Sequence, residues 1–256
     1  MLHGLAASHH DWDWLAPQVI QAGYQVFVPD LPGHGDSPRP RSPASYTLDY
    51  LYQALVVWME QESLPEPFFL IGHSLGGYLS LKIAIERPKQ VLGLVLAAPF
   101  YSLKQIFPLA RHVLKLPMLS EQVLRLATPQ MVDSILWFTA PVLGNYPSQA
   151  RRQTALDYTR TIPASMRFPA SAQDLSSSLA SIEIPVLTVW GKHDLMLRPQ
   201  FFNWLVKALP LAHGIAIPAC GHEPHLAYMA EFNQLALDFI KAHTFDRQPD
   251  IAQHSS

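Results

Sequence analysis

Residues 72–77, with the sequence GHSLGG, place the strongest constraint on the fold of this chain. They follow an apolar run at residues 67–71 and precede a helical pattern, so they predict a strand that turns sharply into a helix with Ser74 at the apex. Such a turn holds the serine in a strained backbone conformation and lifts its hydroxyl clear of the sheet. Side chains at Gly72 or Gly76 would collide with the helix behind the turn. An ordinary glycine-rich turn is the alternative for this stretch taken alone.

Two further residues complete a candidate catalytic triad. A serine hydroxyl needs a base to remove its proton, and the base needs an acid to fix its tautomer. In enzymes with the nucleophile on such a turn, the chain order is Ser, acid, His. Asp194 follows the strand-like run at 184–190, and His222 follows the shorter run at 214–218. Both thus lie past the carboxyl ends of predicted strands, where α/β sheets place their chemistry. Asp194 alone could be a helix N-cap; together with Ser74 and His222 it is predicted to be catalytic.

The twelve histidines do not form a recognisable metal motif. His222 and His225 lack the i, i+4 spacing of the helical zinc motif, and Pro224 between them predicts a helix start. His9 and His10 are adjacent, so on a regular element their side chains point apart. We therefore predict no metal and no cofactor, and we expect His225 to lie in the first turn of the last helix without a chemical role.

The order of predicted elements indicates an α/β fold. Helices are expected at about 12–22, 46–63 and 74–86, alternating with strands at 24–29, 67–71 and 91–97. This alternation predicts a mostly parallel sheet with helices on both faces. Residues 101–181 contain no strand-like run. Helices are expected there instead, at residues 103–116, 120–127, 130–138 and 148–161. The predicted domains are a core at 1–100 and 182–242, an inserted helical lid at 101–181 and a loose tail at 243–256.

Four motifs in this order resemble the α/β-hydrolase superfamily, in particular its lid-bearing serine hydrolases of the esterase or lipase-like type. They are His3-Gly4, the segment 30–37 (DLPGHGDS), the turn at 72–77, and the pair formed by Asp194 and His222. The resemblance covers residues 2 to about 242. It implies an oxyanion hole made by the backbone N–H groups of Leu5 and Leu75, and serine at the nucleophile position points away from relatives that use aspartate there.

The same resemblance implies that the first two strands of the fold, and nearly all of the third, are missing before Met1. On this view Met1 and Leu2 are the last residues of a central strand, without which its neighbours would leave backbone groups unpaired. We expect codons upstream of Met1 to encode those strands, and the 256-residue form to aggregate or show little activity.

The predicted activity is hydrolysis of a small, fairly apolar acyl ester. The residues expected to line the pocket are Trp12, Phe100, Tyr101, Trp137 and Phe138, although each aromatic side chain is as readily explained by packing. Two interpretations are open for the arginines of the predicted lid: binding of a substrate carboxylate, or a solvated helix face. A C–C bond hydrolase or lyase-type relative is an alternative, as is a small-ligand receptor that keeps the fold.

Composition limits the partners. The net charge of −2 gives no case for binding nucleic acid or an anionic membrane. A single cysteine, Cys220, excludes an internal disulfide and fits a reducing compartment. Neither a signal peptide nor a membrane-inserted segment is visible. The predicted partner is a small-molecule substrate and the predicted location is the cytoplasm; the oligomeric state is not indicated.

Overall fold

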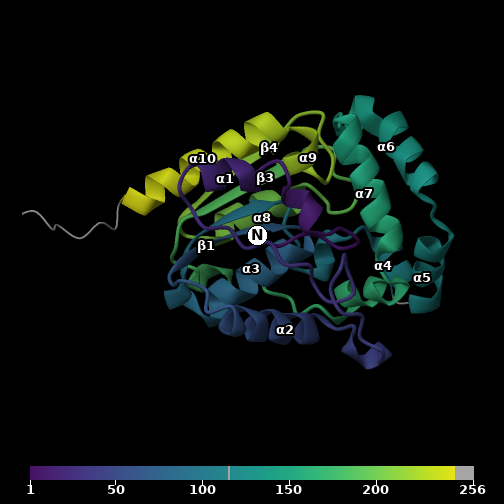
Figure 1. Cartoon of the computed structure of the whole chain (residues 1–256), viewed down its shortest axis with the longest axis horizontal. Helices are drawn as coiled ribbons and strands as arrows, with labels where there is room; N and C mark the ends of the chain where they lie inside the picture. The colour runs from purple at the N-terminus through teal and green to yellow at the C-terminus, as the bar shows by residue number, and fades with distance from the viewer. Residues whose placement is uncertain (115, 246–256) are drawn as a thin grey trace, which may run out of the picture.

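The computed structural model describes residues 1–114 and 116–245 and contains a parallel sheet flanked by helices (Figure 1). The described sheet has four strands in the order β1-β2-β3-β4, and each neighbouring pair is parallel. The strands are β1 (Phe68–His73), β2 (Val91–Ala97), β3 (Val186–Gly191) and β4 (Ala212–Ile217). The predicted α/β fold class is confirmed.

Helices cover both faces of this sheet (Figure 1). Alternate strand residues face opposite sides: Leu94 and Leu96 of β2 pack into one core, and Val95 and Ala97 into the other. The first core is closed by α2 (Leu48–Gln61), α3 (Leu75–Glu86) and α8 (Gln200–Ala208). The second core is closed by α1 (Ala16–Gln21) and α10 (Met229–Phe245). The strands are therefore buried on both faces, as their near-continuous apolar sequences predict.

The segment between β2 and β3 is helical, and it lies at one end of the molecule (teal in Figure 1). Its helices are α4 (Pro108–Leu114), α5 (Pro117–Leu126), α6 (Pro129–Leu143) and α7 (Ser148–Arg160). The α6 helix runs past its predicted end at 138 and contains Pro141. No helix of the described residues has both the length and the apolar composition of a bilayer span.

Two predicted helices are divided in the structure. In place of the helix predicted at 12–22, the chain forms a short 3-10 turn at His9–Trp12 and then α1. The last helix is split into α9 (Pro224–Ala227) and α10. The α10 helix extends through Phe245, so residues 243–245 of the predicted tail are helical, and residues 246–256 lie outside the described residues.

The prediction of a strand at 24–29 is wrong. These residues pair with no strand within 1–114 and 116–245, and an apolar cavity of about 380 Å³ lies between them and β1. A strand is defined by a hydrogen-bonded neighbour. One edge of β1 pairs with β2, and among the described residues the only β-bridge at its other edge is the parallel pair of Leu2 and Gly72. The Leu2 N–H donates to the Ile71 carbonyl (2.7 Å), and its carbonyl accepts from His73 N–H (3.0 Å). This bridge fixes the loop that begins at His3 directly against the end of β1.

Candidate active site

Ser74 occupies the turn between β1 and α3 in a strained backbone conformation, with φ 48° and ψ −106°. Non-glycine residues rarely adopt positive φ, and such strain persists only where the surroundings enforce it. Here the Ser74 N–H donates to the Ala97 carbonyl (3.0 Å), and its carbonyl accepts from the N–H groups of Tyr78 (3.1 Å) and Phe100 (3.0 Å). A side chain at Gly72 would come within 2.6 Å of the Gly76 carbonyl oxygen. The glycines therefore let the turn close as tightly as the sequence pattern predicts.

Ser74, His222 and Asp194 form one continuous hydrogen-bonded chain. The Ser74 hydroxyl lies 2.9 Å from His222 Nε2, and His222 Nδ1 lies 2.7 Å from Asp194 Oδ2. The other oxygen of Asp194 accepts hydrogen bonds from the N–H groups of Met196 (2.7 Å) and Leu197 (2.8 Å). Asp194 thus both caps its own loop and orients His222, so the helix-cap and triad interpretations describe the same carboxylate.

The loops that carry the acid and the histidine hold each other in place. His193 N–H donates to the Cys220 carbonyl (2.9 Å), and Lys192 N–H donates to the Ile217 carbonyl (3.0 Å). A side chain at Gly191 would collide with the backbone of Cys220 and Gly221. The close approach of these two loops is what brings Asp194 to His222 across 28 residues of sequence.

The electrostatic environment keeps His222 basic. Burial by itself lowers the pKa of His222, but the negative charge of Asp194 and its hydrogen bond outweigh burial, so the pKa lies above the ordinary value of 6.5. Glu223, the next residue, is half-buried, and this desolvation raises the pKa of its carboxyl group. A histidine with this pKa takes up a proton readily, as a general base requires.

The two predicted oxyanion donors belong to two separate segments, the start of α3 and the loop after His3-Gly4. Leu75 is the first residue of α3, where backbone N–H groups have no acceptor within the helix. Leu5 lies in the loop after His3-Gly4, and Ala6 next to it has a positive φ of 59°. His3 anchors this loop, since its Nε2 accepts from Leu31 N–H (2.9 Å) and its Nδ1 lies 2.8 Å from the Gly4 carbonyl oxygen. Roles for Leu5 and Leu75 remain a prediction, but the loop is ordered by contacts of its own.

Gly76 offers a direct test of how closely this loop must pack. A Cβ at position 76 would collide with the carbonyls of Leu2 and His3. We expect Gly76→Ala to displace the loop, to lower stability by about 1–3 kcal/mol and to lower ester turnover by on the order of 10²-fold. Thermal unfolding and steady-state kinetics measure the two effects.

Gly23→Ala is the control for this substitution, because its added Cβ meets nothing within 4 Å although its φ is +93°. It should cost stability through backbone strain alone and leave turnover unchanged. Equal turnover in both alanine variants would contradict a requirement for close packing at Gly76.

The five aromatic residues predicted to line the pocket have dissimilar surroundings. Trp12 is fully buried against His225 and Phe232, and Phe100 and Tyr101 are buried in the other core. Trp137 and Phe138 lie on α6 and are 64% and 78% exposed. The apolar cavity between residues 24–29 and β1 is lined by none of these five residues. A pocket role for them stays a prediction.

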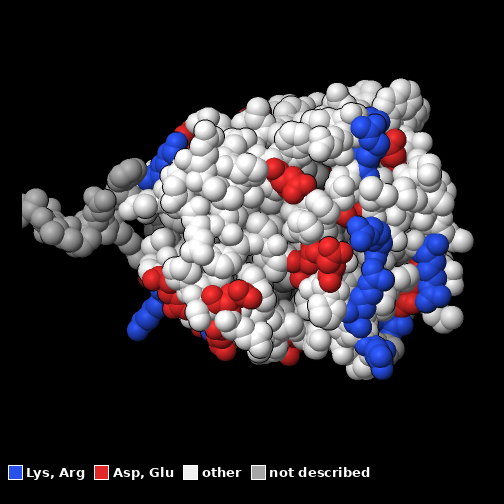
Figure 2. Space-filling model, in the orientation of Figure 1, with Lys and Arg blue, Asp and Glu red and all other residues white. Residues whose placement is uncertain are grey.

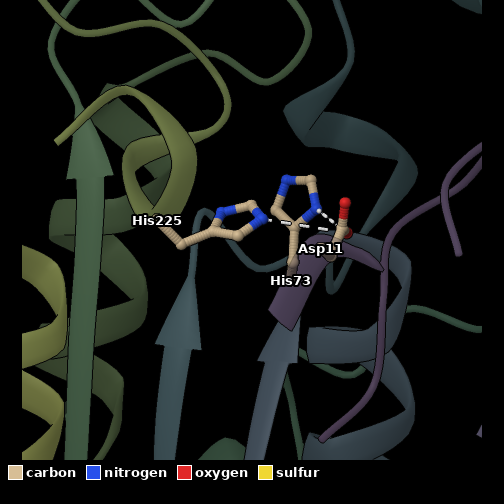
Figure 3. A group of neighbouring side chains, drawn as sticks. All are labelled: Asp11, His73 and His225. Carbon is tan, nitrogen blue, oxygen red and sulfur yellow. Dashed lines mark hydrogen bonds and ion pairs between the residues drawn. The ribbon is translucent and has the colours of Figure 1, made fainter. Parts of the chain in front are cut away.

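Sequence reasoning missed a buried cluster beside the triad. Asp11, His73 and His225 come from the first loop, the end of β1 and α9, and their nearest polar atoms lie within 4.8 Å of one another (Figure 3). These residue types are also those that bind divalent metals. The sequence shows a histidine before Ser74 and an aspartate in the loop after His3-Gly4, but nothing in it indicates that their side chains are in contact. The geometry makes this cluster part of the site.

Charged side chains are unevenly distributed over one face of the molecule. Figure 2 shows most Lys and Arg side chains of this face on the side formed by the helices between β2 and β3, and Asp and Glu side chains over its middle and lower left. Two arginines between β2 and β3 form ion pairs: Arg151 with Asp133 (2.7 Å) and Arg167 with Glu121 (2.6 Å). These two contacts favour a structural role over binding of a substrate carboxylate.

Comparisons with known proteins identify the family. The family model described as "alpha/beta hydrolase fold" matches residues 1–137. A pimeloyl-[acyl-carrier protein] methyl ester esterase of Nitrosomonas europaea is 27% identical over 249 residues, covering 91% of each chain. A 2-hydroxy-6-oxo-6-phenylhexa-2,4-dienoate hydrolase of Burkholderia cepacia is 26% identical over 252 residues, covering 94% of this chain and 86% of the relative.

Two solved structures with a similar fold are esterases. An esterase from Exiguobacterium antarcticum superposes with a TM-score of 0.77 at 17% identity, over 94% of this chain and 91% of the other. A thermophilic esterase from Thermogutta terrifontis has a TM-score of 0.74 at 21% identity, over 94% and 88%. The family match spans more than half of the 256 residues and includes the turn that carries Ser74. The chain is an enzyme that belongs to the α/β-hydrolase family.

Proposed function

We propose that this protein is a serine hydrolase that cleaves a small, fairly apolar acyl ester through an acyl-enzyme intermediate. The observation that carries the proposal is the hydrogen-bonded chain from the Ser74 hydroxyl through His222 to the buried Asp194. A nucleophile, a base and an orienting acid in this geometry have a defined chemistry.

In the first half-reaction, Ser74 Oγ attacks the ester carbonyl carbon as its proton passes to His222 Nε2. The imidazolium that forms is stabilised by Asp194, which keeps its own negative charge. The carbonyl oxygen becomes an oxyanion that the N–H groups of Leu5 and Leu75 would bind, and one such donor is worth about 3 kcal/mol of transition-state stabilisation. Collapse of this intermediate breaks the ester C–O bond, and the alcohol leaves with the proton from His222.

The second half-reaction repeats these steps with water. His222 removes a proton from a water molecule, which attacks the acyl carbon bound to Ser74. Collapse of the second tetrahedral intermediate releases the carboxylic acid, and the proton returns to Ser74. The same donors serve both half-reactions, so no further residue is required.

An ester chain-length panel tests the substrate class. The panel contains p-nitrophenyl esters from acetate to dodecanoate and the corresponding methyl esters, because a relative is named as a methyl ester esterase. We expect kcat/KM to be highest for short to medium uncharged acyl chains, and rapid quenching followed by mass spectrometry to find the acyl group on the peptide that contains Ser74. A preference for charged acyl chains would contradict the apolar substrate class.

A C–C bond hydrolase is the second candidate, favoured by the similarity to the Burkholderia cepacia enzyme over 94% of this chain. The same triad would then act on a ketone that is part of a vinylogous diketone. Turnover of such a diketone with kcat/KM at least about 10²-fold above that of every ester in the panel, a gap of about 2.7 kcal/mol, would select this candidate.

The pH dependence of kcat/KM follows from His222. Only neutral His222 accepts the serine proton, so activity should rise with pH through the pKa of His222 in the free enzyme. Because Asp194 raises that pKa, the rise should be centred above pH 6.5. The effect on stability has the opposite sign: the raised pKa stabilises the fold at low pH, and this contribution is lost as pH rises through it. A rise centred below pH 6.5 would contradict a histidine held basic by Asp194.

A further inference from the structure

We infer that Asp11 is a positioning residue for the oxyanion loop, holding Gly4 and the following Leu5 against the turn that carries Ser74. The inference rests on the proposed function and extends it to a residue outside the triad. Asp11 lies in the 3-10 turn His9–Trp12, and only 5% of its side chain is exposed. A buried carboxylate is costly unless polar partners compensate it, and every partner described here belongs to a different part of the site.

The first partner is the loop itself. The Gly4 N–H donates to Asp11 Oδ2 at 3.1 Å. The Gly4 peptide directly precedes Leu5, whose N–H is the proposed oxyanion donor, so this contact sets the orientation of the chain at that donor. On its other side Gly4 lies against the His73 ring, since an added Cβ would come within 2.6 Å of His73 Nδ1. The loop is thus held between a hydrogen bond and a buried ring.

The second partner links the loop to the triad. His73, the residue before Ser74, has Nδ1 at 3.2 Å from the same Asp11 oxygen and Nε2 at 3.2 Å from the His222 carbonyl oxygen. One imidazole therefore lies between Asp11 and the backbone of the proposed base, and in its neutral form it donates to one of these two acceptors. Movement of Asp11 would be transmitted to Gly4 on one side and to His73 and the His222 loop on the other.

The third partner closes the cluster from α9. His225 Nε2 lies 3.7 Å from Asp11 Oδ2, and the His225 ring packs on the His73 ring with centroids 4.3 Å apart. Figure 3 shows both imidazoles turned toward the carboxylate from different elements. Burial by itself raises the pKa of Asp11, but the contacts with His225 and His73 lower it by more. The pKa therefore lies well below its usual value, and the carboxyl group is ionised. Three segments therefore converge on one charged oxygen.

The expected effect of removing the Asp11 carboxylate follows from its hydrogen bond with Gly4 N–H. Loss of the acceptor leaves the buried Gly4 N–H unpaired, and the loop then shifts to recover a partner. A shift of about 1 Å at an oxyanion donor costs on the order of 10²-fold in rate. The donor acts on charge that develops in the transition state, so the loss should fall on kcat and leave KM nearly unchanged.

The test compares Asp11→Leu with Asp11→Asn. Leucine has a similar shape but no acceptor, whereas the asparagine oxygen can still accept from Gly4 N–H and from the Nδ1–H of His73, which contact the same oxygen of Asp11. We expect Asp11→Leu to lower kcat about 10²-fold with KM within about threefold of wild type, and Asp11→Asn to stay within about fivefold in kcat. The control is Glu121→Gln, another buried carboxylate, which pairs with Arg167 in the lid and should leave kcat unchanged.

Three outcomes would overturn the inference. The first is an unchanged kcat in folded Asp11→Leu, and the second is a change confined to KM. The third is an equal loss in Asp11→Asn and Asp11→Leu together with inactivation of the wild type by a chelator and recovery with Zn²⁺, which would make the cluster a metal site. If Asp11→Leu does not fold by circular dichroism, Asp11→Ser replaces it, because its hydroxyl is too short to reach Gly4. Failure of the proposed function is distinguishable, since it would appear as undiminished turnover in Ser74→Ala whatever Asp11 does.

Discussion

Replacement of Ser74 by alanine is expected to abolish both ester turnover and covalent labelling by a fluorophosphonate probe. The hydroxyl of Ser74 is the group that would form the acyl-enzyme, and His222 lies 2.9 Å from it with no other described nucleophile in its hydrogen bonds. Removal of the nucleophile should lower kcat by at least about 10⁴-fold, to what the remaining parts of the site provide. Steady-state kinetics on an aryl ester and gel fluorescence of the labelled protein measure the two effects.

The matched control is Ser80→Ala on the same helix. Ser80 is fully buried, and its hydroxyl donates to the Gly76 carbonyl (2.8 Å) rather than to a residue of the triad. It should retain labelling and nearly all of the turnover while losing about 1 kcal/mol of stability. Undiminished activity in Ser74→Ala would rule out the serine mechanism, and a loss in both variants would indicate damage to α3.

Asp194→Asn should preserve the fold and lower kcat by roughly 10⁴-fold. The asparagine oxygen can still cap the loop at Met196 and Leu197, but the amide would favour the wrong tautomer of His222. Loss of the negative charge also removes the contribution that raises the pKa of His222, so the remaining activity should rise at a lower pH than in the wild type. The measurements are circular dichroism and a pH profile of kcat/KM.

Asp133→Asn provides the comparison, because this carboxylate on α6 pairs with Arg151 and makes no described contact with the triad. We expect wild-type kinetics from it. If Asp194→Asn loses less than tenfold in kcat, Asp194 is only a cap and the acid that orients His222 lies elsewhere.

Local sequence patterns determined the elements that carry the proposed triad. The β2 strand was predicted at 91–97, where it lies, because its uninterrupted apolar run allows burial on both faces. The sequence predicts the turn at Ser74 because glycine is needed where one backbone segment lies directly against another. A Cβ at Gly76 would collide with the Leu2 carbonyl, and a Cβ at Gly72 with the Gly76 carbonyl. Ser74, Asp194 and His222 each follow such a strand, so their shared edge was inferable from parallel topology alone.

Contacts between distant segments decided what the sequence could not. Residues 24–29 have strand-like composition but no hydrogen-bonded strand neighbour among the described residues, so composition misled there. Trp137 and Phe138 lie on the exposed face of α6, and whether an aromatic side chain lines a pocket or faces solvent depends on how the helix is rotated against its neighbours.

Asp11 is the clearest case of this limit. Nothing in its local sequence distinguishes it from an exposed loop aspartate, yet folding brings it to Gly4, His73 and His225 from across the chain. Periodicity and turn chemistry report the conformation of a segment because they act between near neighbours. The meeting of one carboxylate with three segments is set by the packing of the whole domain, and only the tertiary structure contains it.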